Sequence, residues 1–250
     1  MTIPIQEHGI EIEKNMRLWN KKPLLRRIYF DFYRIIARHI PQEKKGLIVE
    51  IGSGTGNIRE VIPACLRTDL FPNPWVDKVE NAYGLSFPDS SVAVMILFDV
   101  FHHLRYPGTA LDEFHRVLVP GGRIIIFDPF ISITGEIVYG LFHHEPIGNS
   151  KKIEWFAPER WRPEHDTYYA SQGNVTRVFF GKEFASFLHQ WRIVARELFA
   201  AFSYIASGGY SGPQLYPQCF YPLAKAADKI LNALPRLFAT RSLVVLEKKG

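Results

Sequence analysis

The sequence of 250 residues predicts an α/β fold in which helices cover both faces of a mostly parallel β-sheet. Two observations support this. Short apolar runs rich in β-branched residues alternate with helical patterns between residues 47 and 128. These runs are continuously apolar, which is typical of parallel strands buried on both faces. The length fits one large domain, or one domain with an insertion.

The stretch LIVEIGSGTGN at residues 47–57 organises the chain. It predicts a buried strand, then a tight turn and the start of a helix. Gly52, Gly54 and Gly56 stand at alternate positions, where the backbone must bend sharply or let a ligand approach closely. Several classes of cofactor-binding protein share such a turn, so the rest of the chain must distinguish between them.

The N-terminal region is expected to begin with a polar lead-in over residues 1–22. Pro23 then opens a helix to about His39, which Pro41 ends. Apolar residues recur on this helix at helical spacing. They are Leu24, Ile28, Phe32, Ile35 and Ile36.

The first half of the chain alternates strands and helices. Strands are expected at residues 47–51, 66–69, 78–80, 92–98 and 123–128. Helices are expected at 57–62 and from Pro107 to about Leu118, where Thr109 and Asp112 resemble a capping box. Pro120-Gly121-Gly122 ends the second helix. Polar residues follow the strands at the edge where such sheets bind ligands. They are Glu50, Asp69, Asn81, Asp99 and Asp128.

The second half is less regular. A helix is expected at 131–142, an irregular cap or lid at 143–180, and a helix at 182–190. Two final strands are expected at 192–199 and 242–247, and an insert between them contains a helix at 223–234. The domain therefore divides into an N-terminal helical cap (1–43), a core (44–130), a lid (131–190) and C-terminal strands (191–250) with an insert at 200–238.

The formal net charge is +5, and ten Lys and Arg residues fall between Lys14 and Lys45. They form either a solvated helix face or a patch for an anionic substrate, lipid headgroup or nucleic acid. Cys65 and Cys219 lack metal-ligand spacing, so we expect no disulfide, no metal site and a reduced, cytoplasmic setting. The apolar run Val92–Phe98 is too short to span a bilayer.

Five motifs in order carry a resemblance to a known family. Val49–Gly56 is followed by Asp69, by Asn81-Ala82 before LSFPD at 85–89, by FDVFHHL at 98–104 and by RVLVPGG at 116–122. From about residue 44 to 130 the chain resembles class I S-adenosylmethionine-dependent methyltransferases of the type 11 small-molecule group. This resemblance implies a Rossmann-like, doubly wound, seven-stranded sheet with an antiparallel last strand, an N-terminal helical lid and inserts after strands five and six.

The resemblance implies S-adenosylmethionine as cofactor and S-adenosylhomocysteine as product. Asp69 would accept the ribose hydroxyls, and Asn81 stands where the family often has an Asp near the adenine. Phe98 or Asp99 would border the methionine and its methyl group. The implied cofactor-binding residues are Glu50, Gly52, Ser53, Gly54, Gly56, Asp69, Leu70, Asn81, Ala82, Phe98 and Asp99.

Methyl transfer depends mainly on alignment, and a general base helps where the acceptor carries a proton. The candidate bases are Asp99, His102 and His103. Asp99 and His103 are similar in spacing to a segment of phosphobase methyltransferases, in which a tyrosine of the N-terminal helix completes a catalytic latch. Tyr29 or Tyr33 would take that part, or would serve as packing aromatics.

The lid segment suggests the acceptor. Aromatic residues there indicate an apolar, ring-bearing or lipid-linked molecule, unless they form the core of the lid. They are Trp155, Phe156, Trp161, Tyr168 and Tyr169. The lid also offers His143, His144, Glu145, His165 and Asp166 as contacts, without metal-ligand spacing.

We therefore expect a methyltransferase for a small-molecule, lipid-linked or sugar-linked acceptor, without DNA, as a monomer or homodimer. The alternatives are a methyltransferase acting on RNA or protein, a non-catalytic cofactor-binding protein, and a nucleotide-dependent oxidoreductase.

Overall fold

In a computed structural model, which describes residues 5–142, 145–148, 152–165 and 169–250, seven strands form one sheet. Their order is β3-β2-β1-β4-β5-β7-β6. The pairs from β3 to β5 are parallel, and β7 runs antiparallel to both β5 and β6. The strands are β1 Leu47–Ile51, β2 Cys65–Asp69, β3 Lys78–Val79, β4 Val92–Phe98, β5 Leu118–Pro129, β6 Trp191–Phe199 and β7 Arg241–Lys248. The mostly parallel seven-stranded sheet with an antiparallel last strand is thus confirmed.

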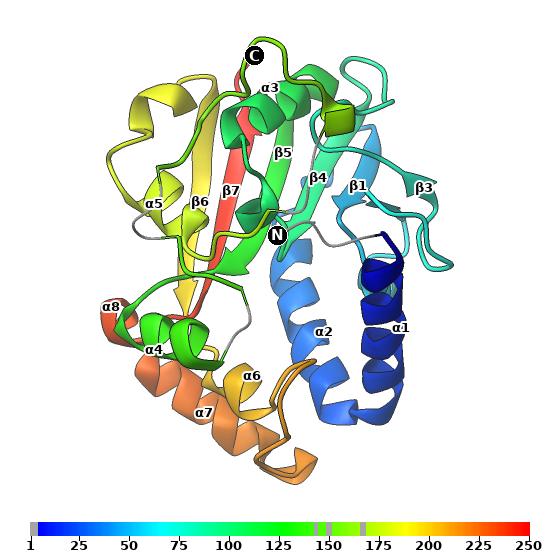
Figure 1. Cartoon of the computed structure of the whole chain (residues 1–250). Helices are drawn as coiled ribbons and strands as arrows, with labels where there is room; N and C mark the ends of the chain where they lie inside the picture. The colour runs from blue at the N-terminus through cyan, green and yellow to red at the C-terminus, as the bar shows by residue number, and fades with distance from the viewer. Residues whose placement is uncertain (1–4, 143–144, 149–151, 166–168) are drawn as a thin grey trace.

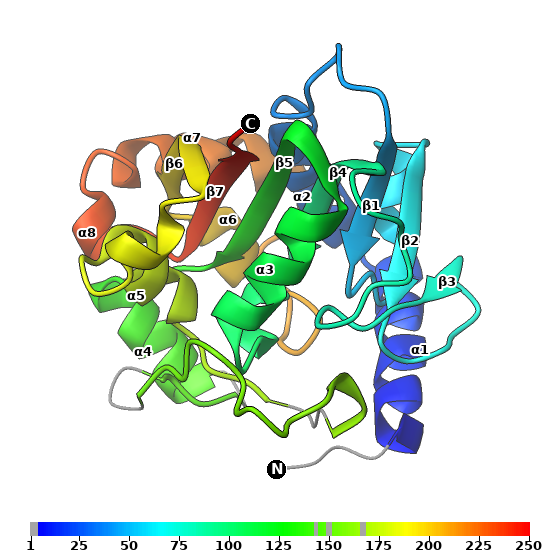
Figure 2. The same cartoon turned by 90° about the horizontal axis from the view of Figure 1, so that it is seen from above.

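Helices cover both faces of the sheet. Figure 2 shows α3 (Pro107–Val117) and α5 (Asn174–Phe180) on one face, and α2 (Pro23–Ala37), α6 (Phe202–Ala206) and α7 (Tyr221–Leu231) on the other. Successive side chains of β4 alternate between the two cores. Met95 and Leu97 pack with α3, whereas Val94 and Ile96 pack with α2. Burial on both faces explains why the strand sequences are continuously apolar.

Helix α2 confirms the expected amphipathic helix and ends at Ala37, two residues before His39. Its apolar face lies against the sheet, where the rings of Phe32 and Phe127 are 4.9 Å apart. Leu25 and Ile36 are fully buried on the same face. The helix therefore fixes the N-terminal cap firmly over β4 and β5.

The expected polar lead-in was wrong, because residues 5–21 form helix α1 (Ile5–Lys21). Ile12 and Trp19 are buried at helical spacing among charged residues. The Trp19 ring packs against Tyr29 at 5.7 Å, and its Nε1 donates a hydrogen bond to Glu60 at 3.2 Å. Two anchoring side chains thus suffice to hold a helix whose sequence is otherwise polar.

Strict strand–helix alternation was also wrong. Residues 70–91, which connect β2 to β3 and β3 to β4, contain no α-helix. The helix expected at 57–62 is a single 3-10 turn, Asn57–Glu60, which ends three residues before Pro63. The helix expected at 182–190 is likewise a 3-10 turn, Ala185–Leu188. Nucleating an α-helix is unfavourable, and these segments are too short to form enough further hydrogen bonds to offset that free energy.

Local signals around α3 were misread. Tyr106 precedes the helix, and Thr109 Oγ1 accepts a hydrogen bond from the backbone of Ala157 in the lid rather than forming a capping box. Strand β5 begins directly after α3 and includes the Pro-Gly-Gly turn. The pairing moves from Val92–Leu118 to Val94–Arg123, so residues 119–122 form a bulge.

The C-terminal half supplies helices at one end of the sheet. Helices α4 (Ile133–Phe142), α6, α7 and α8 (Pro235–Phe238) gather at the end toward which the arrows of β4 and β5 point (Figure 1). Parallel sheets bind ligands at this end. The segment expected to be irregular contains α5, and the helix expected at 223–234 is α7, at 221–231.

His143, His144, Asp166 and Tyr168 lie outside the described residues. Within the described ranges, no helix combines the length and apolar character that crossing a membrane requires.

We predict that Ile96→Ala lowers the free energy of unfolding by about 2–5 kcal/mol, because the side chain is fully buried in the central strand. The matched control is Ile230→Ala on α7, whose side chain is 74% exposed and should change stability by less than about 0.5 kcal/mol. Urea unfolding followed by circular dichroism measures both. Equal losses of unfolding free energy in the two variants would contradict the burial of Ile96 in the core.

Candidate active site

The glycine turn after β1 takes a backbone conformation that favours glycine. Gly52, Gly54 and Gly56 have φ angles of 67°, 51° and 64°. A Cβ at Gly52 would lie 2.5 Å from Val100, whereas a Cβ at Gly54 would have no described atom within 4 Å. The turn therefore packs against the chain after β4 on one side and presents bare backbone at Gly54 on the other.

Asp69, the last residue of β2, lies directly beside this turn. Its buried carboxylate accepts hydrogen bonds from the backbone N–H groups of Gly54 at 2.8 Å and Phe71 at 3.1 Å. The Ser53 N–H donates to the Thr68 carbonyl at 2.8 Å. The predicted acid and the predicted glycine turn thus form one unit, held by a charge-assisted hydrogen bond.

Glu50 brings an unusual carboxyl group to the same place. Its side chain is 4% exposed, and within the described part of the chain its Oε2 has no hydrogen-bond partner. Burial raises the pKa of this carboxyl from 4.5 to about 8, and the nearby Asp69 charge also raises it. A buried polar atom without a partner is costly, so this oxygen is a candidate contact for a ligand.

Asn81 joins the sheet edge to the lid. Its Oδ1 accepts from the Tyr83 backbone at 2.9 Å, and its Nδ2 donates to the Pro163 carbonyl at 3.1 Å. Leu70, just after Asp69, is 37% exposed. The residues expected near an adenine therefore lie together where the lid meets β2 and β3.

Asp99 follows β4 and has a φ of 56°, which is rare for a residue other than glycine. Its Oδ1 accepts a short hydrogen bond from Nη1 of Arg241, the first residue of β7. Arg241 is 3% exposed. Burial alone would lower the pKa of Arg241, but the Asp99 carboxylate raises it well above its ordinary value. Arg241 was missed by the sequence analysis, since no motif marks it.

A tyrosine cluster surrounds this ion pair. It consists of Tyr29, Tyr33, Tyr139, Tyr204 and Tyr210. The Tyr29 ring lies 5.9 Å from Tyr33, 6.0 Å from Tyr204 and 5.4 Å from Tyr210. The Arg241 guanidinium lies 4.7 Å from the Tyr204 ring centre.

Tyr29 and Tyr33, the two tyrosines of α2 that the sequence suggested, lie beside the end of β4. Their rings lie 5.3 Å and 5.4 Å from Phe98, respectively, at the end of β4. Burial raises the pKa of both Tyr29 and Tyr33 well above the usual range. Both phenols are therefore neutral at physiological pH.

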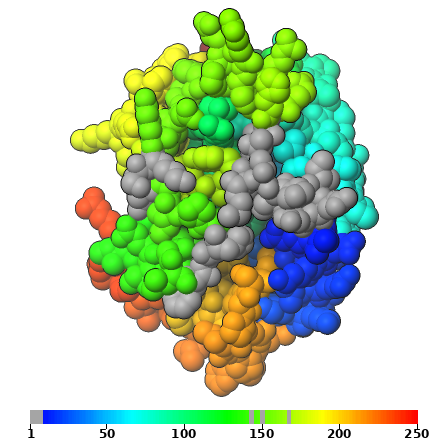
Figure 3. All heavy atoms as spheres, viewed as in Figure 1, coloured from blue at the N-terminus to red at the C-terminus, as the bar shows by residue number. Residues whose placement is uncertain are grey.

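The loop after α6 completes the cover. Lys22 Nζ donates hydrogen bonds to the carbonyls of Gly209 at 2.9 Å and Gly212 at 2.8 Å. Figure 3 shows this orange segment lying close to the blue N-terminal helices. The loop carries Tyr210, whose hydroxyl lies beside Thr55 and Asn57 of the glycine turn. Sequence reasoning identified this region only as an insert.

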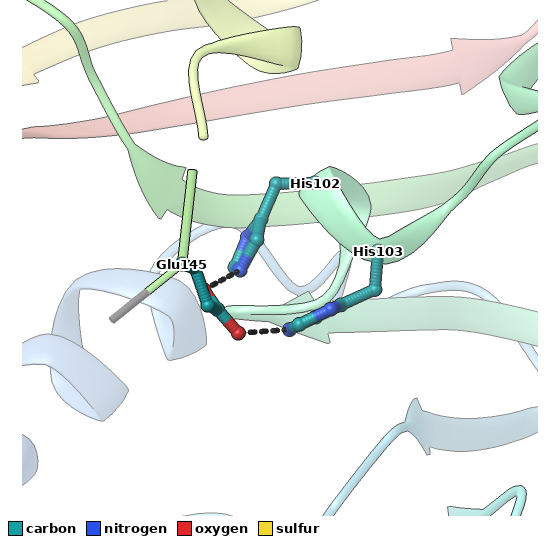
Figure 4. A group of neighbouring side chains, drawn as sticks. All are labelled: His102, His103 and Glu145. Atoms are coloured by element: carbon teal, nitrogen blue, oxygen red, sulfur yellow. Dashed lines mark ion pairs between the residues drawn. The ribbon is translucent and has the colours of Figure 1, made fainter. Parts of the chain in front are cut away.

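A second polar group lies next to the tyrosine cluster. His102 and His103 lie on the 3-10 turn Phe101–His103 after β4 and both face Glu145 (Figure 4). His102 Nε2 lies 3.3 Å from Glu145 Oε2, and His103 Nε2 lies 3.6 Å from Glu145 Oε1. His102 Nδ1 also contacts Asp128 Oδ1 at 3.0 Å. Burial would lower the pKa of His102, but the two carboxylates raise it to about 10.

The fold and the glycine turn can now be compared with known proteins. Residues 49–126 match the model of the protein family described as "Methyltransferase domain". This stretch is thus similar to methyltransferase domains. The match runs from within β1 through most of β5 and includes Glu50, the glycine turn, Asp69 and Asp99.

One curated relative is "Probable polyketide synthase 10" from Dictyostelium discoideum, which is 33% identical over 132 residues. The matched segment is 52% of this chain and 5% of that protein. The chain thus corresponds to a small part of the relative's length.

Two solved structures share the fold. One is a "SAM-dependent methyltransferase, possible histamine N-methyltransferase" from Thermotoga maritima, with a TM-score of 0.54 and 14% identity, covering 97% of this chain and 100% of that one. The other is geranyl diphosphate C-methyltransferase from Streptomyces coelicolor, with a TM-score of 0.52 and 10% identity, covering 87% and 78%.

Glu50 should make stability depend on pH. Its pKa is about 8 in the folded protein and near 4.5 when unfolded, so the folded state retains a proton that the unfolded state releases. Stability should therefore fall between pH 4.5 and pH 8, by up to about 1.4 kcal/mol per pH unit. We predict that Glu50→Gln removes this dependence in urea unfolding measured from pH 5 to pH 8.

The control is Glu159→Gln, which changes an exposed glutamate and should follow the wild-type pH profile. A constant difference between the wild type and Glu50→Gln across this range would show that Glu50 is ionised throughout.

Proposed function

We propose that this enzyme transfers a methyl group from S-adenosylmethionine to a small molecule that has a ring or apolar body and an oxygen atom able to accept a hydrogen bond. One observation carries the proposal. Arg241 Nε is buried inside the tyrosine cluster and has no hydrogen-bond partner among the described residues. Leaving such a donor unpaired costs about 1–3 kcal/mol, so an acceptor oxygen would be stabilised there.

The residues around the glycine turn fit the cofactor. We assign Glu50 Oε2 to its ammonium group, Asp69 to the ribose hydroxyls, and Leu70 with Asn81-Ala82 to the adenine. The unpartnered oxygen of Glu50 and the bare backbone at Gly54 support this assignment. When bound, the cofactor supplies an electrophilic methyl group on a sulfonium.

The chain's own contribution is alignment and exclusion of water. Tyr29, Tyr33 and Phe98 would hold the apolar body of the acceptor, and their mutual packing would keep water from the reacting atoms. The Asp99–Arg241 pair would orient its polar end. The left-handed backbone at Asp99 places this carboxylate beside Phe98, at the end of β4 where the methyl group is expected.

The proton of a hydroxyl or amine acceptor needs a base. His102 is poorly suited, because its Nδ1 contacts Asp128 and its Nε2 faces Glu145. His103 is similarly placed, with Nδ1 on the Tyr169 carbonyl and Nε2 facing Glu145, so we favour Asp99 for this role. The two free cysteines, Cys65 and Cys219, support our proposal of a reducing, cytoplasmic compartment.

One observation favours an alternative acceptor. A groove of about 510 Å³ lies along the outer side of α2 and is lined by Arg26, Arg27 and Arg34. Such a groove could hold the phosphate backbone of an RNA substrate, and binding would then weaken steeply with salt. Methylation of RNA or protein, with none of any small molecule, would support this alternative.

We predict that Asp69→Asn weakens binding of S-adenosylhomocysteine at least about tenfold, because charge-assisted hydrogen bonds contribute about 1.5–3 kcal/mol. Isothermal titration calorimetry measures the dissociation constant. Asp89→Asn, which changes an exposed surface acid, is the control and should bind like the wild type. An unchanged constant for Asp69→Asn would refute the ribose assignment.

The acceptor should be sought with radiolabelled S-adenosylmethionine and a panel of phenols, carboxylic acids and phosphorylated isoprenoids. For the acceptor found, Arg241→Lys should raise KM about tenfold or more, since lysine keeps the charge beside Asp99 but lacks the Nε donor.

The cofactor's dissociation constant should stay within about twofold in Arg241→Lys, and Arg192→Lys, at an exposed arginine, is the control. An unchanged KM in Arg241→Lys would show that Arg241 does not contact the acceptor.

A further inference from the structure

We propose that His102, His103 and Glu145 form a binding site for one divalent first-row transition-metal ion of the Zn²⁺ class. One ligand atom from each residue lies within 4.8 Å of the others (Figure 4). This site goes beyond the proposed methyl transfer and does not depend on it. Three features support a metal ion here: the orientation of the imidazoles, the spacing of the ligand atoms, and an unpartnered polar group beside them.

Each imidazole ring is oriented by a protein oxygen atom that contacts its Nδ1, the ring nitrogen that faces away from Glu145. His102 Nδ1 lies 3.0 Å from the Asp128 carboxylate, and His103 Nδ1 lies 2.9 Å from the Tyr169 carbonyl. A carbonyl accepts and cannot donate, so His103 Nδ1 carries the hydrogen and its Nε2 carries the lone pair of the neutral ring. Carboxylate and carbonyl partners on the remote nitrogen are the usual supports of metal-ligating histidines.

The spacing of the ligand atoms also fits a metal. The distances from Glu145 oxygens to the two Nε2 atoms are 3.3 Å and 3.6 Å. Hydrogen bonds from nitrogen to oxygen are typically about 2.7–3.2 Å long, so both distances are long for direct bonds. Two ligands each about 2.1 Å from a zinc ion at a tetrahedral angle are about 3.4 Å apart.

The chain holds Glu145 in place from a second direction. The backbone of Gln172 pairs with that of Pro146 and Gly148, which fixes the short segment carrying Glu145. The Gln172 side chain is 1% exposed, and its Nε2 donates a short hydrogen bond to Glu145 Oε2.

The other end of the Gln172 amide points to a further ligand. In the described part of the chain, Gln172 Oε1 and the neighbouring Ser171 Oγ have no hydrogen-bond partner. Three protein ligands leave at least one coordination position for water, and a metal-bound water is a donor for such an acceptor.

The type of ligand selects the type of metal. Two imidazoles with one carboxylate favour zinc, iron, cobalt or nickel, whereas magnesium and calcium prefer all-oxygen sites. The buried carboxylates of Asp128 and Glu145 bring two negative charges to the site, and a divalent cation balances them. Sequence spacing could not reveal this, since Glu145 follows the histidines only after β5 and α4.

The test uses the untagged chain of 250 residues, stripped with a chelator and then dialysed. Titration with Zn²⁺ in a calorimeter should show one equivalent bound. Co²⁺ should give visible d–d absorption bands of a site with nitrogen and oxygen ligands, which needs no variant. Glu145→Gln and His103→Gln should weaken Zn²⁺ binding at least about tenfold. The matched controls, Glu159→Gln and His189→Gln, should bind like the wild type.

Failure of wild-type protein to bind Zn²⁺, or equal affinity in Glu145→Gln, His103→Gln and the controls, would overturn the site. Circular dichroism should show that the variants are folded, and the Co²⁺ spectrum of the wild type decides the matter if they are not. Binding of S-adenosylhomocysteine to stripped protein is measured separately. Its failure would count against the proposed function and leave the metal result standing.

Discussion

The ion pair between the buried Arg241 and the half-buried Asp99 is the constraint on which this edge of the fold depends. It joins the residue after β4 to the first residue of β7, on either side of β5. Ions taken out of water cost several kcal/mol each unless they are paired well, so neither group can move alone. Asp99 accepts a left-handed backbone to reach its partner, and Arg241 lies against Tyr204. The tyrosines of three separate segments then pack around a fixed pair of charges.

The sheet could be read from the sequence because its signal is local. Strands β1 and β4 are short apolar runs with turn residues near them, and the bounds of both agree to the residue, whereas β5 begins five residues before the apolar run that predicted it. Helix α1 could not be read in the same way. Its two buried residues, Ile12 and Trp19, are separated by charged residues, so the sequence shows no clear apolar face. Trp19 is buried because Tyr29 and Glu60 lie opposite it in the folded chain.

The candidate site likewise has one part that local sequence patterns predicted and one part that they did not. The part of the site expected to bind the cofactor was predicted from contiguous motifs. The structure brings its residues Glu50, Gly54 and Asp69 together, as those motifs suggested. The other half depends on tertiary contacts that leave no pattern in the chain. Arg241 looks like any arginine at the start of a strand. Tyr210 is carried to the glycine turn by a loop that Lys22 holds from far away in the sequence. Glu145 reaches the two histidines through backbone pairing with Gln172.

The tyrosine cluster has a consequence for how such enzymes diversify. Its members come from α2, α4, α6 and the loop after it, whereas the matched methyltransferase segment is the single stretch 49–126. The two parts meet where Tyr210 lies beside Thr55 and Asn57 and where Asp99 pairs with Arg241, so only substitutions away from these contacts leave the matched segment undisturbed. The loop at 207–212 is bound to the N-terminal helices through two backbone carbonyls, which any residue can supply. Gly208 and Gly209 have φ angles of 74° and 49°, which favour glycine, so variation that keeps the position of the loop falls on its other residues. Selection, natural or in the laboratory, could change the molecule that is modified without altering the group that is transferred.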